Sequence, residues 1–386
     1  MRVAGLFAGI GGLEVGLSYS GHESVLLSEI STPAQAVLAD RFPNAEQLGD
    51  VLTINSLPSD IDLLTAGFPC QDLSQAGRTA GISGSRSGLV AQIIKLLEVR
   101  RVPWVLLENV SFMLQLDAGR AMAFLVDEFE RLGYRWAYRV VNSEASLPQR
   151  RERVIFVATT TEVDPADVVH VDDVGSKRRE GSLTSLAHGF YWTEGVRGLG
   201  WAIDSIPTLK NGSTIGIPSP PAILLPTGRV VTPDIRDAER LQGFPEDWTV
   251  AARAVSRESS RWSLVGNAVS VPIARWVGKR LACPGHYDSV RDVPLDSKAR
   301  WPKAARYDGN KRVAVRIGPY PEWEYREPLD EFLRYPGKNL SIRAAKGFLA
   351  RTERSQLRFV EGFREAVRSH LRFVEDAASY VPIAAE

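Results

Sequence analysis

Residues 1–159 alternate short apolar runs with segments whose apolar residues recur at helical spacing, and this alternation limits the folds open to the chain. The apolar runs have the length of strands and cover residues 2–7, 24–28, 61–66, 102–107, 134–141 and 154–159. The helical patterns lie between them, over residues 12–20, 33–41, 88–100 and 117–132. Such alternation predicts an α/β fold built on a doubly wound, mainly parallel sheet.

Four residues stand where predicted strands end and so mark one edge of that sheet. Phe7, Glu29, Cys70 and Glu108 each follow an apolar run. In open α/β sheets, ligands bind beyond the carboxyl ends of the strands. Cys70 is a candidate nucleophile, because a thiol between a buried strand and a loop rich in glycine and serine occupies a typical active-site position. The sequence therefore predicts a reactive site at this edge.

The composition excludes several classes of protein. The 386 residues are 44% apolar and 24% charged, as in an ordinary soluble protein of two or three domains. No apolar run is long enough to cross a membrane. The only cysteines, Cys70 and Cys283, cannot form a disulfide framework, which favours a reducing cytoplasm. Cysteine and histidine do not cluster in the sequence, so no zinc site is predicted. The net charge is +1, so binding to nucleic acid would depend on local basic patches.

The pattern divides the chain into four parts. Residues 1–159 form the predicted catalytic and cofactor domain, whereas residues 160–232 are rich in Gly, Pro, Ser and Thr, as in a small inserted domain with no convincing helix. Regular patterning returns over residues 233–282, which we expect to rejoin the first domain. Residues 283–386 are a C-terminal extension to which the sequence assigns no role. A repeated Leu-Arg-Phe-Val-Glu within it predicts a helix over residues 357–375 that docks on its own protein rather than on a coiled-coil partner.

The first strand leads into a glycine-rich turn that suits a cofactor. The turn departs from the dinucleotide-binding motif, because Glu14 stands where the third glycine belongs. A pyrophosphate beside Glu14 would be repelled, which disfavours a nucleotide-dependent dehydrogenase, whereas S-adenosylmethionine has no phosphate. In this interpretation Glu29 accepts hydrogen bonds from the ribose hydroxyls, and Asp50 receives the adenine amino group. The residues of the turn expected to contact the cofactor are Phe7, Gly9, Ile10, Gly11 and Gly12.

In their order along the chain, the motifs resemble those of the cytosine-C5 DNA methyltransferases of bacterial restriction–modification systems. After the glycine turn come Gly67-Phe-Pro-Cys-Gln71, Glu108-Asn-Val110, Gln149-Arg-Arg-Glu-Arg153 and Gly266-Asn-Ala-Val269. The resemblance covers residues 3–281. It implies the fold of the S-adenosylmethionine-dependent methyltransferases, with that molecule as cofactor and Phe7 against its adenine ring. It also implies that the cofactor pocket is lined by Pro69, Leu89, Asn267 and Ala268.

The chemistry expected of this family gives roles to four residues. Cytosine C5 becomes nucleophilic when a thiolate adds to C6, and Cys70 is the predicted thiolate. Glu108 is expected to address N3 and the exocyclic amine of the ring. Arg151 and Arg153 are two residues apart in a predicted strand and so point to one face, where they would hold the cytosine carbonyl oxygen and steady Glu108.

A cytosine inside a duplex cannot reach Cys70, so it must be rotated out of the stack. The loop after Cys70 has glycines for a mobile lid, and the residues expected to contact DNA are Gln71, Ser74, Gln75, Arg78 and Arg86. Residues 160–232 are expected to read the target sequence. Thr208 lies in a Thr-Leu element that resembles those of the family's recognition regions, and is a candidate near the flipped nucleotide. Cations that could read guanine or grip phosphate are Lys177, Arg178, Arg197, Lys210 and Arg229; Arg240 is expected to be structural.

Two other activities remain open at this point. Some relatives on the same scaffold methylate cytosine in RNA, and an inactive binding protein could keep the fold. The recognition insert favours duplex DNA, and the intact set Cys70, Glu108, Arg151 and Arg153 favours an enzyme. We expect a monomeric, cytoplasmic prokaryotic enzyme that binds double-stranded DNA and no membrane, and that is paired with a cognate restriction endonuclease.

Overall fold

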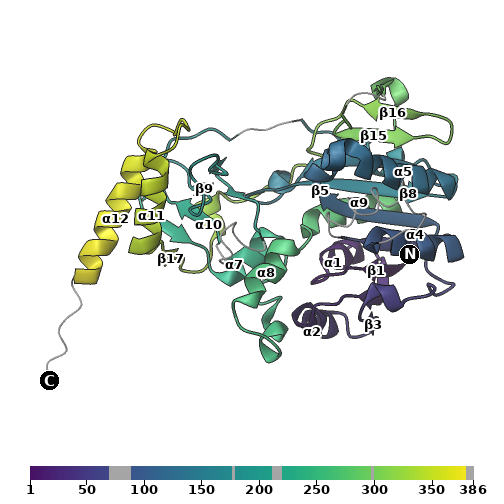
Figure 1. Cartoon of the computed structure of the whole chain (residues 1–386), viewed down its shortest axis with the longest axis horizontal. Helices are drawn as coiled ribbons and strands as arrows, with labels where there is room; N and C mark the ends of the chain where they lie inside the picture. Colours follow the sequence, from purple (N-terminus) through teal and green to yellow (C-terminus); the bar gives the residue numbers. More distant parts are fainter. Residues whose placement is uncertain (69–87, 176–178, 211–219, 297–299, 380–386) are drawn as a thin grey trace.

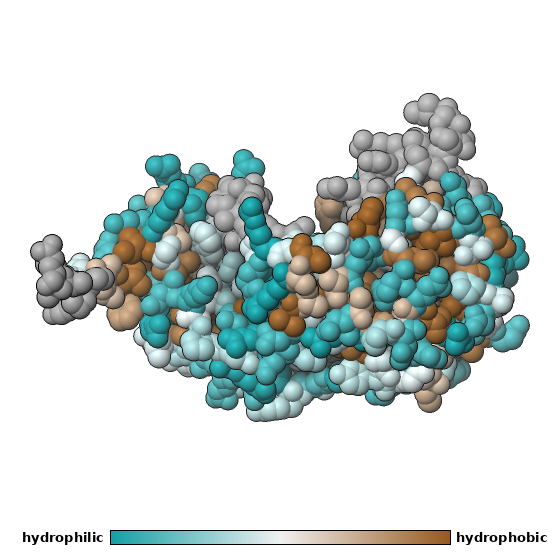
Figure 2. All heavy atoms as spheres, turned by 90° about the horizontal axis from the view of Figure 1, so that it is seen from below, coloured by the Kyte–Doolittle hydropathy of each residue, from teal (hydrophilic) through white to brown (hydrophobic). Residues whose placement is uncertain are grey.

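The computed structural model describes residues 1–68, 88–175, 179–210, 220–296 and 300–379. These residues form two lobes that lie side by side (Figure 1). The larger lobe holds the N-terminal part of the chain, and the smaller lobe ends in the C-terminal helices. In the space-filling view, the outline of the molecule dips between the lobes (Figure 2). Within the described ranges, no helix is both long and apolar enough to cross a membrane.

A ten-stranded sheet forms the centre of the larger lobe, in the order β14-β16-β15-β6-β8-β5-β4-β1-β2-β3. The strands are β1 Arg2–Leu6, β2 Glu23–Ser28, β3 Glu46–Leu48, β4 Leu63–Ala66, β5 Trp104–Val110, β6 Arg135–Asn142, β8 Glu152–Thr159, β14 Asp292–Pro294, β15 Ala304–Tyr307 and β16 Arg312–Val315. The strands from β1 to β5 are parallel to one another. The predicted α/β fold with a doubly wound, mainly parallel sheet is confirmed.

One strand in the middle of the sheet, β8, runs in the opposite direction. It pairs antiparallel with both β5 and β6, so that Arg153 lies opposite Val110 and Glu152 lies opposite Asn142. The link from β6 to β8 is too short for the crossover that parallel strands need, so these two strands form an antiparallel pair. As a result, β8 begins at the edge of the sheet where β5 ends.

Helices cover both faces of the large sheet. The α-helices of the described ranges are α1 Gly12–Ser18, α2 Thr32–Arg41, α4 Leu89–Val99, α5 Arg120–Arg131, α6 Ala166–Val169, α7 Ile235–Leu241, α8 Ser260–Asn267, α9 Val271–Ala282, α10 Leu329–Phe332, α11 Ile342–Glu353 and α12 Phe363–Ser379. Short 3₁₀-helices are η1 Val51–Thr53, η2 Ser111–Leu114, η3 Leu116–Gly119, η4 Ser143–Ala145, η5 Val250–Ala254 and η6 Ser289–Arg291.

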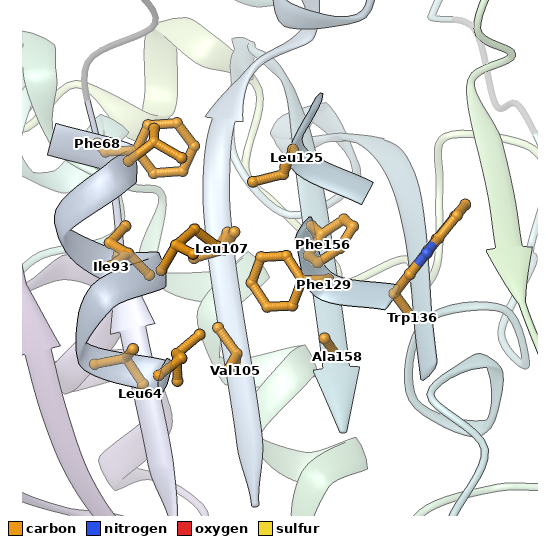
Figure 3. Close-up of a cluster of buried hydrophobic side chains, with 14 of the residues drawn as sticks. Leu64, Phe68, Ile93, Val105, Leu107, Leu125, Phe129, Trp136, Phe156 and Ala158 are labelled. Atoms are coloured by element: carbon orange, nitrogen blue, oxygen red, sulfur yellow. The ribbon is translucent and has the colours of Figure 1, made fainter. Parts of the chain in front are cut away.

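Alternate residues of each central strand pack on opposite faces. Helices α4 and α5 pack on one face against side chains that include Leu64, Leu107 and Phe156 (Figure 3). Helices α1 and α9 pack on the other face, against side chains that include Leu63 and Leu106. Because these strands are buried on both sides, their sequences are continuous apolar runs, which is why they could be predicted.

The smaller lobe is built on a five-stranded sheet in the order β10-β9-β12-β13-β17. Its strands are β9 His188–Phe190, β10 Ala202–Ile203, β12 Ala222–Leu224, β13 Val230–Thr232 and β17 Lys338–Asn339. A short parallel pair, β7 Gln149–Arg150 with β11 Ile206–Pro207, connects this lobe to the segment before β8. Helices α11 and α12 pack on the sheet, where the rings of Phe348 and Phe363 each lie 5.1 Å from that of Phe190.

The C-terminal segment belongs to both lobes. Strands β14 to β16 extend the large sheet beyond β6, whereas β17, α11 and α12 complete the smaller lobe. The helix predicted over residues 357–375 begins only at Phe363, after Gly362 with a left-handed φ of 77°. It docks on its own protein, as predicted, because Phe363 and Val367 are fully buried.

Two further details differ from expectation. The fourth predicted helix starts at Arg120 rather than at residue 117, because Asp117 and Ala118 have left-handed φ values of 52° and 56°. Within its described residues, the inserted segment contains one short helix, α6, whose Ala166 and Val168 pack on the large sheet. The division of the chain at residues 160, 233 and 283 stays a prediction.

Candidate active site

The turn between β1 and α1 depends on left-handed backbone and on close contacts. Phe7, Gly9 and Gly11 have φ values of 54°, 58° and 84°. A Cβ atom on Gly12 would lie 2.6 Å from the carbonyl oxygen of Val269, so only glycine lets α1 begin against the segment before α9. This turn leaves Phe7, Gly9 and Ile10 on the wall of a cavity.

The cavity lies at the carboxyl ends of the parallel strands and has a volume of about 690 Å³, a size that suits a cofactor. Its wall is formed by the ends of β1, β2, β4 and β5, by the start of β8 and by α8. The predicted site residues on this wall are Phe7, Gly9, Ile10, Glu29, Asp50, Leu89, Glu108, Arg151, Arg153 and Asn267. The fold thus brings together residues that are far apart in the sequence.

Two carboxylates on the wall are held by backbone donors. The two oxygens of Glu29 accept hydrogen bonds from the N–H groups of Gly9 and Ser31, each at 2.8 Å. Asp50 caps η1, where its Oδ1 accepts a hydrogen bond from the N–H of Leu52 at 2.9 Å. A carboxylate oxygen has a second lone pair, so these groups can still accept hydrogen bonds from a ligand. They suit a ligand that presents hydroxyl and amino donors.

The end of β5 and the start of β8 bring a carboxylate and a guanidinium together. Nε of Arg153 lies 2.9 Å from Oε1 of Glu108, and both side chains are largely buried. Burial lowers the pKa of Arg153, and the charge of Glu108 opposes that shift. Asn109 braces the end of β5, because its amide nitrogen donates to the carbonyl of Phe68 at 3.0 Å. The wall therefore carries a preorganised ion pair.

Arg151 holds three segments together rather than pairing with a carboxylate. Its guanidinium donates to the carbonyl oxygens of Leu209, Gly266 and Ala268, at 3.1, 3.3 and 2.7 Å. Burial, and to a smaller extent the charge of Arg153, lowers its pKa well below the usual value. The expected contact with Glu108 is made by Arg153. Arg151 lies between β7 and β8, so the side-chain alternation of a strand does not apply to it.

The segment that contains the predicted nucleophile lies outside the described residues. The residues concerned are Pro69, Cys70, Gln71, Ser74, Gln75, Arg78 and Arg86, and their roles stay predictions. Phe68 and Leu89 stand near the two ends of this segment, and both line the cavity.

Comparison with known proteins decides the family. The sequence model for "C-5 cytosine-specific DNA methylase" matches residues 1–187. The type II methyltransferase M2.BsuMI of Bacillus subtilis (strain 168) is 46% identical over 367 residues, which span 92% of this chain and 94% of the relative. This chain belongs to the C-5 cytosine-specific DNA methylase family. The type II methyltransferase M.DsaV of Dactylococcopsis salina is 28% identical over 312 residues, 73% of this chain and 86% of that relative.

The solved structure of the S. pombe Dnmt2 methyltransferase shares the fold of this C5 methylase. The two superpose with a TM-score of 0.52 at 18% sequence identity, over 73% of this chain and 97% of that one. The family model and the relative at 46% identity confirm the resemblance seen in the motifs, and the protein is a DNA methyltransferase that acts at cytosine C5.

Several predicted site residues of the C5 methylase do not line the cavity formed by the described residues. Gly11 and Gly12 shape the turn behind the wall, and Ala268 is buried with its carbonyl oxygen bound to Arg151. Thr208 lies in the smaller lobe, where its hydroxyl donates to the carbonyl of Arg150 at 2.8 Å.

The predicted recognition cations differ in their surroundings. Lys177 and Arg178 lie outside the described ranges. Lys210 forms an ion pair with Glu194 at 2.7 Å, Arg229 donates to the side chain of Asn339 at 2.7 Å, and Arg197 is exposed. Arg240 pairs with the buried Asp237 at 2.8 Å, which fits the structural role expected of it.

A buried amide network behind the wall was not predicted. The side chain of Gln149 donates to the carbonyl of Leu241 at 2.7 Å and to Oε1 of Gln242 at 3.0 Å. Gln242 in turn donates to the carbonyl of Val265 at 2.8 Å. Gln149 begins one of the motifs that resemble those of the family, but only the fold shows that its amide meets that of Gln242.

Glu14 does not act as the sequence suggested. Its side chain is 1% exposed, and its Oε1 accepts a hydrogen bond from the hydroxyl of Thr65 at 3.1 Å. A Cβ atom on Gly5 would lie 2.5 Å from the same oxygen, so Glu14 points into the protein between α1 and the sheet. Repulsion between Glu14 and a phosphate in the cavity is therefore not the reason for the departure from the dinucleotide motif. Burial raises the pKa of Glu14 to about 7.

Proposed function

We propose that this C5 methylase transfers a methyl group from S-adenosylmethionine to C5 of a cytosine rotated out of a specific duplex DNA sequence. One observation carries the proposal: a single cavity is lined both by Glu29 and Asp50 and by the Glu108–Arg153 pair. Methyl transfer needs the donor and the reacting ring to be held side by side, and one shared cavity meets that need.

The carboxylate part of the wall fits the cofactor. Glu29 would accept the ribose hydroxyls and Asp50 the adenine amino group, while Phe7 offers an aromatic surface to the adenine. Carboxylates would repel a phosphate group, and S-adenosylmethionine has none. When bound, it supplies a methyl group on a positively charged sulfur.

At the other part of the wall, the residues prepare the cytosine. As the cytosine enters, Glu108 takes up a proton from solvent and passes it to N3 while the Cys70 thiolate adds to C6, so that C5 becomes nucleophilic. Arg153 keeps Glu108 aimed at the ring through their ion pair. After C5 has accepted the methyl group, a base removes the C5 proton, the sulfur leaves C6, and N3 returns its proton to Glu108. The aromatic ring and the thiolate are thereby restored.

We also propose that the protein works as a monomer and protects DNA against a cognate restriction endonuclease. The names of two relatives support this role, because M2.BsuMI and M.DsaV are both type II methyltransferases. A host that expresses the protein should then hold DNA that resists an endonuclease cutting at the methylated sequence.

Expression in a bacterium without DNA methylation, followed by bisulfite sequencing, tests the activity. We expect 5-methylcytosine at one sequence context with the wild-type protein and none with Cys70→Ala. Unmodified DNA together with methylated transfer RNA would assign the activity to RNA instead. The absence of methylation in both nucleic acids would leave a binding protein.

A trapping experiment tests the bond between Cys70 and the cytosine. A duplex with 5-fluorocytosine at the target blocks removal of the C5 substituent, so the adduct should persist on a denaturing gel in the presence of S-adenosylmethionine. Cys70→Ala should bind the same duplex without forming the adduct. A stable adduct with that variant would refute the choice of nucleophile.

A further inference from the structure

The smaller lobe contains a second cavity, with a volume of about 310 Å³. Three segments distant in sequence line it: Arg150 from β7, residues 199–201 before β10, and residues 357–360 between α11 and α12. The wall combines aromatic and apolar side chains with the guanidinium groups of Arg150 and Arg358. Among the described residues, no carboxylate lines this cavity.

The cavity lies next to the recognition element and to the start of β8. The carbonyl of Arg150 accepts the hydroxyl of Thr208 at 2.8 Å, and Arg151 follows directly in the chain. The hydroxyl of Tyr191 donates to the carbonyl of Thr208 at 2.6 Å. The ring of Tyr191 also packs on Gly200 of the cavity wall, where a Cβ atom would lie 2.4 Å from it. Tyr191 therefore contacts both the cavity wall, at Gly200, and Thr208, the predicted recognition residue.

The C-terminal wall of the cavity is fixed in place although it is not helical. The hydroxyl of Ser355 donates to the carbonyl of Val196 and accepts the N–H of Leu357, each at 3.0 Å. Phe359 stacks on the buried Phe363, with a distance of 6.1 Å between ring centroids. Residues 357–360 are thus part of the smaller lobe rather than a loose connection.

The two guanidinium groups of the cavity are exposed, and no partner for them is found in the described part of the chain. Arg150 and Arg358 are both exposed, and neither has an ion pair or a side-chain hydrogen bond among the described residues. Two other cations of the smaller lobe are engaged, since Lys210 pairs with Glu194 and Arg229 donates to Asn339. Guanidinium groups beside aromatic and apolar side chains suit the sugar–phosphate backbone of a nucleotide, because guanidinium groups bind phosphate and the carbon face of the sugar packs on apolar side chains.

We propose that this cavity holds a nucleotide of the DNA strand that flanks the target cytosine. Arg150 and Arg358 bind its phosphate, and the side chains of Trp201 and Phe359 pack against its sugar. The C-terminal segment, which lies outside the motifs of the family, then takes a direct part in DNA binding. This inference rests on the proposed function, since it takes duplex DNA as the substrate.

The test compares Arg358→Ala with Arg354→Ala. Arg354 is also exposed and lies four residues earlier, but it does not line the cavity. Affinity for a fluorescent duplex that contains the methylated sequence is measured over a series of salt concentrations. We expect Arg358→Ala to weaken binding by about fivefold and to reduce the salt slope by about one, as for the loss of one phosphate contact. Arg358→Lys should restore the salt slope, and Arg354→Ala should leave the affinity and the slope unchanged.

Two further measurements separate the possible outcomes. If Arg150 and Arg358 bind the same phosphate, the double variant should lose less affinity than the two single losses combined. An equal salt slope for Arg358→Ala and Arg354→Ala would overturn the inference while leaving methylation by the wild type intact. A wild-type protein that binds DNA but does not methylate it would instead contradict the proposed function. In that case the salt slopes of Arg358→Ala and Arg354→Ala would be compared on sheared DNA from the methylation-free host.

Discussion

Arg153 stands opposite Val110 on the neighbouring antiparallel strand, and its Nε atom lies 2.9 Å from Oε1 of Glu108. This meeting depends on the direction of β8. A parallel β8 would begin at the opposite edge of the sheet and would carry Arg153 away from the end of β5. The short connection after β6 thus brings the start of β8 to the site.

Replacing Arg153 by alanine should reduce the rate of methyl transfer at least about 100-fold, with a smaller effect on DNA affinity. The variant leaves Glu108 without its cation and without the contact that aims it. Single-turnover methylation with labelled cofactor measures the rate, and Arg153→Lys should recover part of it because it keeps the charge. A wild-type rate for Arg153→Ala would exclude a role of the pair in the reaction.

Glu14 should make the stability of the protein fall as pH rises. Its pKa is raised from 4.5 to about 7 in the folded state by burial, so the native protein binds the proton more tightly than the unfolded chain. The stabilisation from the neutral form is complete below pH 4.5 and is lost as pH rises toward 7. The loss amounts to about 3 kcal/mol.

Urea unfolding at pH 5 and at pH 8 measures this effect. Glu14→Gln removes the titration but can keep the bond to Thr65, so it should lower the difference in unfolding free energy between the two pH values. Relative to the wild type, the variant should gain stability at pH 8 and not at pH 5. Glu46→Gln, at an exposed position, is the control. An identical effect of Glu14→Gln at both pH values would show that Glu14 does not titrate in this range.

The strand ends that carry Phe7, Glu29 and Glu108 could be predicted because doubly buried strands are continuous apolar runs, and their convergence follows from parallel topology. The partner of Glu108 could not be assigned in the same way. Strand alternation placed Arg151 and Arg153 on one face, but the fold puts Arg151 outside the strand and binds it to three carbonyls. The alternation of side chains assigns a residue to one face of the sheet only if the residue lies within a strand.

The smaller lobe was harder to predict for a different reason. Its strands β10, β11 and β17 have two residues each, too few to show any period. Strands β17 and β13 are paired but lie far apart in the sequence, so no local sequence pattern predicts the pair. The helix α12 could be expected, since its apolar face repeats over several turns, but its docking site on Phe190 belongs to another segment of the chain.

Arg151→Lys should raise the KM for S-adenosylmethionine by about tenfold and lower the free energy of unfolding by about 1–3 kcal/mol. Arginine bridges the carbonyls of Leu209, Gly266 and Ala268, and lysine keeps the charge but cannot span all three. Steady-state kinetics and urea unfolding measure the two effects. Arg257→Lys is a matched control at an exposed position, and both values should stay at wild type. Equal behaviour of the two variants would show that the bridging is dispensable.

Phe363→Ala should destabilise the smaller lobe by about 3–5 kcal/mol and weaken DNA binding, while binding of S-adenosylmethionine is retained. Phe363 is fully buried and contacts the rings of Phe190, Phe348 and Trp201, so it joins α12 both to the small sheet and to the second cavity. Phe7, Glu29 and Asp50, the proposed cofactor residues, lie in the other lobe and do not depend on this packing.

Calorimetric titration with the cofactor and anisotropy with the duplex measure the two binding reactions of the Phe363→Ala protein. Phe373→Ala is the control, because Phe373 lies on the same helix with 48% of its surface exposed, and it should change stability by less than about 1 kcal/mol. If Phe363→Ala abolished cofactor binding and DNA binding together, the lobes would unfold as one unit. Loss of DNA binding alone would show that the C-terminal helix supports recognition and not the cofactor site.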